Sequence, residues 1–149
     1  MVPRTVIDTN IWVSAILNPI GYPARIRKSF EEGDFLVIIS EPLIDELVDV
    51  LNRPRIKNKY GLSEADIWEL IVLIAERTEH VLLSEDVNIC RDKDDNHIIE
   101  TAIKGYAEYL VTRDDDIKFD KTISKFLSNY SISVVSTAKF LEIIETRKS

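Results

Sequence analysis

The sequence predicts an α/β fold: a single-domain, three-layer α/β/α arrangement around a central, mostly parallel sheet of about five strands. Short apolar segments alternate with segments of helical periodicity along the chain, as expected when helices cover both faces of a parallel sheet. Several of the apolar segments lack polar alternation, which is typical of strands buried on both faces. The length of 149 residues suits one domain, which we assign to residues 1–149.

The first half of the chain divides at clear signals. A strand is expected at residues 5–7, followed by a helix at 11–17 that Asn18-Pro19 and Gly21 interrupt. Pro23 suits the first turn of a second helix, which Gly33 can stop. A buried strand at 35–39 leads into a helix at 41–52 that Ser40 can cap. Residues 53–61 are polar and are expected to form a loop or a frayed turn.

The second half continues the alternation. Ser63 and Asp66 resemble a capping box, with Leu62 and Ile67 as a hydrophobic staple, for a helix that ends near Arg77. Further elements are expected in the following order: a strand at 81–83, a loop at 84–94, a helix at 95–104 ended by Gly105, a strand at 109–112, a short helix at 123–129, a strand at 132–135 and a helix at 136–146.

Composition narrows the functional classes. The net charge of −7 argues against a nucleic-acid-binding protein unless the acids bind cations, because phosphate contacts favour clustered Lys and Arg. A single cysteine, Cys90, excludes an internal disulfide framework. No apolar run reaches the ~18 residues that a membrane span needs. We expect a cytoplasmic protein without a signal peptide.

Two acids follow strands directly. Asp8 ends the first predicted strand, and Asp114 follows the strand at 109–112. Ligands of parallel sheets bind at the carboxyl ends of the strands, so both acids are candidates for a site. Each also has a purely structural interpretation, because aspartate favours helix caps and turns; we weigh the two interpretations equally for either acid alone.

Two more acids are placed less firmly. On a helical wheel of residues 41–53, Glu46 lies at the border of the apolar face and Asp45 lies nearly as close, so the wheel does not choose between them. Asp95 begins a helix, where acids are also favoured by the helix dipole. Glu100, in the middle of that helix, is expected to form a salt bridge rather than to support the site.

Five segments of the chain form a recognisable series. They are Val6-Ile7-Asp8-Thr9-Asn10, Leu43-Ile44-Asp45-Glu46-Leu47, Asp95-Asn96-His97-Ile98-Ile99-Glu100-Thr101-Ala102, Leu110-Val111-Thr112-Arg113-Asp114-Asp115-Asp116-Ile117 and Val134-Val135-Ser136-Thr137-Ala138-Lys139-Phe140-Leu141. Together these segments resemble the PIN domain, the nuclease domain of VapC-type toxins and of several RNA-processing factors. The resemblance extends over about residues 4–144, and within the family the chain is similar to a branch described as toxin components. That branch carries proline where this chain has Lys93.

The resemblance implies a metal-dependent endoribonuclease, expected to be the toxin of a toxin–antitoxin pair. It places catalytic, metal-binding carboxylates at Asp8, Glu46, Asp95 and Asp114, and auxiliary roles at Thr9, Asn10, Thr112 and Asp116. Oxygen ligands without His or Cys select Mg²⁺ or Mn²⁺ over zinc. RNA is the implied substrate and a small antitoxin the implied partner. We also expect a homodimer or a higher homo-oligomer.

Two other functions compete with this one. A phosphatase of the haloacid dehalogenase type also begins with an aspartate after its first strand, but it needs a second Asp where this chain has Asn10. A PIN-fold module could instead bind RNA or a protein without cleaving anything. Two basic segments are candidates for guiding RNA, although each could be ordinary surface: Arg25, Arg27 and Lys28, and Arg53, Arg55, Lys57 and Lys59.

Overall fold

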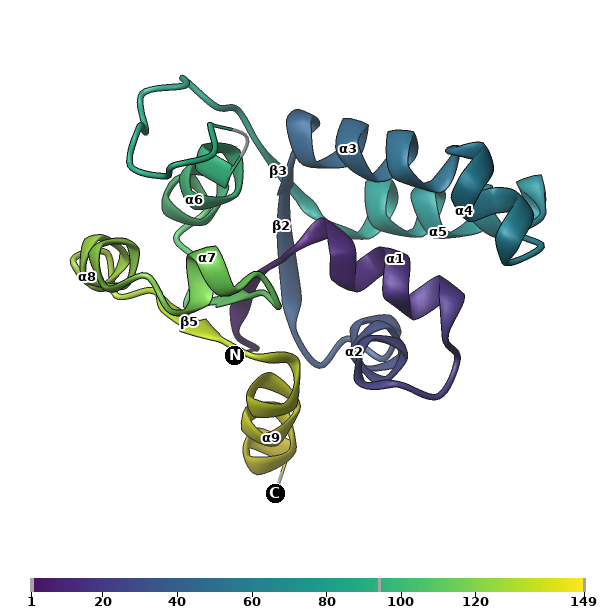
Figure 1. Cartoon of the computed structure of the whole chain (residues 1–149). Helices are drawn as coiled ribbons and strands as arrows, with labels where there is room; N and C mark the ends of the chain where they lie inside the picture. Colours follow the sequence, from purple (N-terminus) through teal and green to yellow (C-terminus); the bar gives the residue numbers. More distant parts are fainter. Residues whose placement is uncertain (1, 94, 149) are drawn as a thin grey trace.

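The central sheet contains five parallel strands in the order β3-β2-β1-β4-β5 (Figure 1). The computed structural model describes residues 2–93 and 95–148. The strands are β1 (Arg4–Ile7), β2 (Leu36–Ser40), β3 (Glu79–Val81), β4 (Tyr109–Val111) and β5 (Ser133–Val135). The predicted α/β class and the number of strands are therefore confirmed, and every strand pairing is parallel.

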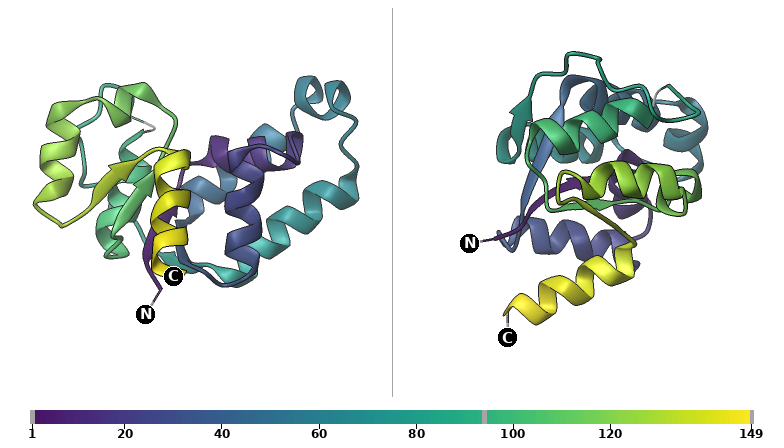
Figure 2. Two further views of the ribbon diagram at one scale, coloured as in Figure 1. Left: turned by 90° about the horizontal axis from the view of Figure 1, so that it is seen from below. Right: turned by 90° about the vertical axis from the view of Figure 1, so that its left-hand side faces the viewer.

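Helices cover both faces of the sheet (Figures 1 and 2). On one face lie α1 (Thr9–Leu17), α2 (Tyr22–Glu31), α3 (Glu41–Leu51), α4 (Pro54–Lys59), α5 (Glu64–Arg77) and α9 (Thr137–Lys148). On the other lie α6 (Asp95–Lys104), α7 (Asp115–Lys118) and α8 (Lys121–Ser128). In the part of the chain that is described, no helix combines the length and the hydropathy that crossing a membrane requires.

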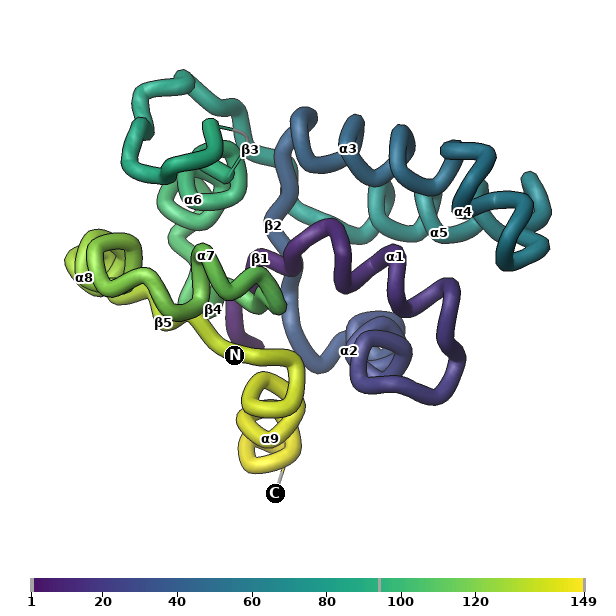
Figure 3. The backbone as a smooth tube through the Cα atoms, in the orientation of Figure 1, coloured from purple at the N-terminus to yellow at the C-terminus, as the bar shows by residue number. Residues whose placement is uncertain are grey.

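Connections from β1 to β2 to β3 step in one direction across the sheet, and those from β4 to β5 step in the other. The chain therefore changes direction between β1 and β4, which lie side by side in the middle of the sheet (Figure 3). At such a switch point the connecting segments diverge to opposite faces and leave a crevice at the carboxyl ends of the two strands. This topology marks the edge where a ligand site is expected.

Aromatic side chains join the helices of one layer to the sheet. Trp12 contacts Phe30 edge-on at a ring-centroid distance of 5.4 Å, and Phe35 contacts Phe140 at 4.9 Å. All four rings are buried, and Phe30 lies against Phe35 to complete the chain of contacts. Such edge-to-face pairs stabilise a core by about 0.5–1.5 kcal/mol each beyond the burial of their area. They fix α1, α2 and α9 against the strands that carry the crevice.

Gly105 ends α6 as expected, and its packing adds a reason for glycine. A Cβ atom at this position would lie 2.4 Å from Cγ2 of the Ile38 side chain on β2. Only glycine allows such a close approach of the helix end to the sheet. The end of α6 is thus held on β2, which helps to fix the helix that begins with Asp95.

Three elements differ from the sequence prediction. Residues 54–59 form α4 rather than a loop, because proline at the first helical position favours a helix even though no side chain there is buried. The strand predicted at 81–83 is β3 (Glu79–Val81), and Leu82 is 91% exposed, because pairing with β2 rather than local hydropathy sets the register. The four-residue α7 was not predicted at all, since it is too short to show periodicity.

The predicted caps fare differently. The capping box of α5 is confirmed, because the Ser63 hydroxyl accepts a hydrogen bond from the Asp66 amide at 3.0 Å. Ser40, by contrast, makes no side-chain cap with α3 among the described residues, and its hydroxyl shares a 2.8 Å hydrogen bond with Thr101 of α6. The prediction for Ser40 was wrong because a buried hydroxyl partner from the opposite layer competes with the helix amides.

Candidate active site

Asp8 and Asp114 follow two neighbouring strands, β1 and β4, at the switch point. Ile7 of β1 is in register with Val111 of β4, and the Asp8 amide continues this ladder by donating a 3.0 Å hydrogen bond to the Val111 carbonyl. Asp114 follows Val111 by three residues and begins α7 as its N-cap. Both acids therefore lie at the carboxyl edge of the sheet, where the topology opens a crevice.

Thr112 connects the two acids directly. Its hydroxyl donates a hydrogen bond to Oδ2 of Asp8 at 2.7 Å and accepts one from the backbone amide of Asp114 at 2.9 Å. Thr112 is completely buried, and both bonds are partly buried. A single hydroxyl thereby fixes the Asp8 carboxylate relative to the turn that carries Asp114.

Asp8 occupies the N-cap position of α1, but its side chain makes no full capping hydrogen bond there among the described residues. Its carboxylate lies near the first two amides of the helix, those of Thr9 and Asn10. Burial raises the pKa of Asp8, and the nearby charge of Asp114 raises it further, whereas the Thr112 hydrogen bond and the amides of Thr9 and Asn10 lower it. A carboxylate kept in a half-buried position beside another acid is a candidate for a functional site.

Asp114 does cap its helix, because its Oδ1 accepts a hydrogen bond from the Asp116 amide at 2.9 Å. Asp114 is therefore a helix cap, as one of its two interpretations expected, but the cap involves only Oδ1 of its carboxylate. Asp116 is exposed, and one of its oxygens lies 3.4 Å from the Arg91 guanidinium. The auxiliary residues Thr9 and Asn10, at the start of α1, are buried and exposed respectively.

Asp95 joins the same electrostatic cluster from α6. Its pKa is raised to about 6, first by burial and then by the charges of Asp114, Asp92, Asp8 and Asp116, in that order. Asp95 therefore lies within electrostatic reach of Asp8 and Asp114. Three carboxylates separated by up to 106 positions in the printed sequence therefore influence one another at the same edge of the sheet.

A cavity of about 460 Å³ opens beside this cluster. It is lined by Cys90, Arg91, Asp92, Asp95, Asp116, Asp120 and Ile123. Burial and the surrounding aspartates raise the pKa of Cys90 to about 11, which keeps the thiol protonated and unreactive at neutral pH. The chemistry of this cavity is therefore that of its carboxylates.

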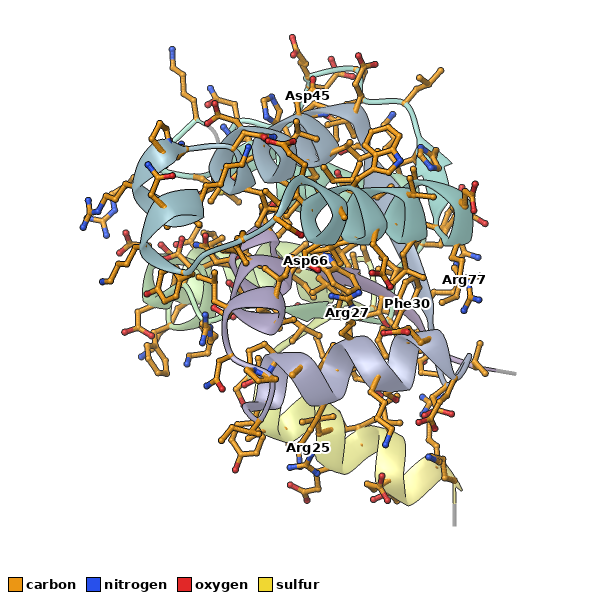
Figure 4. The ribbon with its side chains drawn as sticks, turned by 90° about the vertical axis from the view of Figure 1, so that its right-hand side faces the viewer. Arg25, Arg27, Phe30, Asp45, Asp66 and Arg77 are labelled. Carbon is orange, nitrogen blue, oxygen red and sulfur yellow. The ribbon has the colours of Figure 1, made fainter. Side chains whose placement is uncertain are left out.

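Glu46, the fourth predicted acid, lies on α3 with an exposed side chain. The largest charge contributions to the pKa values of Asp8 and Asp95 come from aspartates, so membership of Glu46 in the cluster stays a prediction. Asp45, the alternative on the helical wheel, lines a separate hollow with Glu41 and the end of β3, and Figure 4 shows it at the periphery of the molecule. Asp45 therefore lines a different hollow from the cavity beside the cluster.

Two buried polar residues of α6 support the loop at 84–93. Glu100 is only 2% exposed and accepts hydrogen bonds from the Ser84 amide and hydroxyl at 2.6 and 3.2 Å, so the expected salt bridge was wrong. Oδ1 of Asn96 accepts bonds from the amides of Ile89 and Cys90 at 3.1 and 2.9 Å. Sequence reasoning gave Asn96 no role. Its position could have suggested one, because Asn96 is a polar residue next to the predicted ligand Asp95 and lies on the buried side of the helix.

Residues 4–116 match the PIN domain family. The chain belongs to the PIN domain family. This match confirms the resemblance drawn from the sequence and contains all four predicted acids. PIN domains are generally nucleases that use divalent metal ions.

Two further comparisons found proteins that are similar to this PIN domain. The chain is 28% identical over 144 residues to the uncharacterized protein MJ1680 of Methanocaldococcus jannaschii, covering 95% of this chain and 92% of that protein. The crystal structure of FitAcB from Neisseria gonorrhoeae is similar in fold, with a TM-score of 0.53 and 18% identity, covering 89% of this chain and 97% of that one. At this identity the structural match supports the fold alone.

The donor set of this PIN domain fits a hard divalent cation. Its carboxylate oxygens at Asp8, Asp95 and Asp114 are the ligand type that Mg²⁺ and Mn²⁺ prefer. Within residues 2–93 and 95–148, no three Asp, Glu, His or Cys side chains already form a cage that could hold a metal ion. The chemistry of the cluster therefore matches the family's cofactor class, whereas complete coordination would need side-chain adjustment or water ligands.

Proposed function

We propose that this PIN domain is a metal-dependent endoribonuclease that hydrolyses RNA phosphodiester bonds with Mg²⁺ or Mn²⁺. The observation that carries the proposal is the convergence of Asp8, Asp95 and Asp114, whose mutual repulsion helps to raise the pKa of Asp95 to about 6. Such a cluster is costly without a cation, and it persists where it serves a site. Glu46 is proposed as the fourth acid.

Each residue of the cluster has a proposed task. Asp8 and Asp114 would be the main metal ligands, and Thr112 orients Asp8 through its hydrogen bond. A bound divalent cation would polarise the scissile phosphate and lower the pKa of an attacking water. Asp95 and Glu46 would position that water. The carboxylate of Asp95 would accept a proton from that water, in a hydrolysis without a covalent intermediate.

We further propose that the protein is the toxin of a toxin–antitoxin pair and acts in the cytoplasm. Support comes from the sequence resemblance to VapC-type toxins, which are held inactive by a small antitoxin. A homodimer or higher homo-oligomer belongs to the same proposal. An acidic site is a suitable target for an antitoxin, because a basic side chain inserted among Asp8, Asp95 and Asp114 would relieve their repulsion.

Cleavage of a panel of defined, end-labelled RNAs tests the nuclease proposal. We expect cleavage with Mn²⁺ or Mg²⁺, none with EDTA, and loss of cleavage in Asp8→Asn purified in the same way. The matched control is Asp45→Asn, an identical change on an acid that lines a separate hollow. RNA binding without cleavage under all metal conditions would contradict the enzyme and support the alternative of a binding module.

A further inference from the structure

A groove beside the acidic cavity has the opposite chemical character. It has a volume of about 490 Å³ and is lined by Ile89, Lys121, Thr122, Lys125, Phe126 and Asn129. Most of these residues come from α8, which begins after its N-cap Asp120. The groove therefore has an apolar wall and two cationic side chains in a chain whose net charge is −7.

The groove and the acidic cavity are immediate neighbours. Cys90 and Ile123 line the cavity, whereas the adjacent residues Ile89 and Thr122 line the groove. The same two segments thus separate the hollows, one on each side. A chain molecule that lies in the acidic site can reach the groove by crossing this narrow ridge.

The two lysines of the groove are available for an anion. Lys121 and Lys125 are one helical turn apart, both are exposed, and in the described part of the chain neither forms an ion pair. Like charges at this spacing disfavour a helix slightly. A bound phosphate would reverse that effect.

An aromatic pair adds a surface for stacking. Phe126 lies in the groove and contacts Tyr130 with ring centroids 5.6 Å apart, and Tyr130 is 50% exposed. Cationic side chains that follow a backbone, combined with aromatic rings that stack on bases, are the features that bind single-stranded nucleic acids without strong sequence preference. The bases of a double helix already stack on one another, so they would not be available to stack on these side chains.

The basic segments predicted from the sequence are less suitable. Arg27 pairs with Glu31, Arg53 with Asp49, and Lys57 with Glu64. Figure 4 shows Arg25 and Arg27 on opposite sides of α2. Arg25 lines a hollow together with Lys28, but three acids, Glu32, Asp34 and Glu145, line the same hollow. In Figure 1, α4 lies at the side of the molecule opposite α8.

We propose that the α8 groove binds the nucleotides next to the scissile phosphate of a single-stranded RNA, with Lys121 and Lys125 on phosphates and Tyr130 on a base. This inference rests on the proposed nuclease function and deepens it. The acidic cluster cannot attract RNA by itself, because its charges repel phosphate in the absence of cations. The groove supplies affinity beside a site that supplies chemistry.

Fluorescence anisotropy with a short labelled oligouridine in EDTA, over a range of salt concentrations, tests the lysines. The double variant Lys121→Gln/Lys125→Gln should raise the dissociation constant about tenfold and reduce the slope of log K against log[salt] by about 1.4, the value for two phosphates on a single strand. The control Lys28→Gln/Lys59→Gln makes the same charge change in the two sequence-predicted segments and should alter binding little. The stacking residue has a matched pair in Tyr130→Ala and Tyr22→Ala, since the two tyrosines are 50% and 49% exposed; only the first should weaken binding, by about fivefold or more.

The outcomes separate the groove from the enzyme. Equal affinities for both lysine double variants, or a larger loss in the control pair, would overturn the groove while cleavage by the wild type left the nuclease standing. A second outcome is that the wild type cleaves no RNA with Mn²⁺, whereas Lys121→Gln/Lys125→Gln weakens RNA binding. That result would support the groove and refute the nuclease. In cleavage assays the groove variants should raise KM and leave kcat within about twofold.

Discussion

The hydroxyl of Thr112 donates a 2.7 Å hydrogen bond to the carboxylate of Asp8, a residue 104 positions earlier in the chain. The same oxygen accepts a bond from the amide of Asp114, so the geometry of two predicted metal ligands depends on one buried atom. The family resemblance implied an auxiliary role for Thr112, and the folded chain supplies its two partners.

Thr112→Val keeps the shape of the side chain and removes this oxygen. We expect a loss of about 1–3 kcal/mol of stability, because the Asp114 amide loses a buried partner. The pKa of Asp8 should rise further, since the lost bond lowers it. kcat for RNA should fall more than tenfold at 25 °C where the variant is folded, and Thr112→Ser should restore it. Wild-type kcat in the folded valine variant would contradict the positioning role.

Asp8→Asn removes a charge and retains the size of the side chain. If Asp8 is a metal ligand, cleavage should fall by orders of magnitude while the fold persists. The melting temperature should be unchanged or higher, because burial and Asp114 already disfavour the charged form of Asp8. Full metal-dependent activity in this variant would remove Asp8 from the mechanism.

The raised pKa of Asp95 predicts a pH dependence of stability. The folded protein holds the Asp95 proton up to about pH 6, whereas the unfolded chain releases it near 3.8. The unfolded state therefore binds fewer protons in this window, and metal-free stability should fall as pH rises from about 4 to 6 and then level off. Asp95→Asn should lack this contribution and melt at a higher temperature than the wild type at pH 7. Melting curves in EDTA across this range check it; a pH profile unchanged by the substitution would contradict the shift.

Divalent metal should stabilise the native state by mass action. At a concentration ten times the dissociation constant, binding contributes about 1.4 kcal/mol, which raises the melting temperature of a domain of this size by roughly 3–5 °C. Mn²⁺ titrations followed by thermal unfolding measure this effect, with Asp8→Asn as the variant that should lose most of it. Identical shifts in the wild type and Asp8→Asn would place the bound metal elsewhere.

Asn96 is expected to hold the loop before α6. Asn96→Ala leaves the amides of Ile89 and Cys90 without their acceptor and should cost about 1–3 kcal/mol, with faster hydrogen exchange at those two amides. Asn96→Asp keeps the acceptor oxygen and should preserve their protection. Asn88→Ala, on the exposed part of the same loop, is the control. Unchanged exchange at both amides in Asn96→Ala would show that the loop is held by other contacts.

Local patterns were sufficient for much of the fold. Alternating strands and helices gave the α/β class, and the strand that precedes Asp8 and the capping box at Ser63 appeared where expected. The patterns failed where partners were distant. The register of β3 depends on β2, and the hydroxyl of Ser40 forms a hydrogen bond with Thr101 rather than with an amide of its own helix. Hydropathy and capping preferences report only on near neighbours in the chain.

The sequence by itself determined that acids follow two strands and begin a helix. It therefore also determined which edge of the sheet carries the candidate site. Tertiary structure alone decided that Asp8, Asp95 and Asp114 interact, because strand order and the β1–β4 switch point arise from long-range pairing. It also decided that Glu100 binds Ser84 and that the basic groove on α8 lies beside the acidic cavity. Residue type fixes what chemistry a side chain can perform, whereas pKa, partner and accessibility depend on neighbours that only the folded chain supplies.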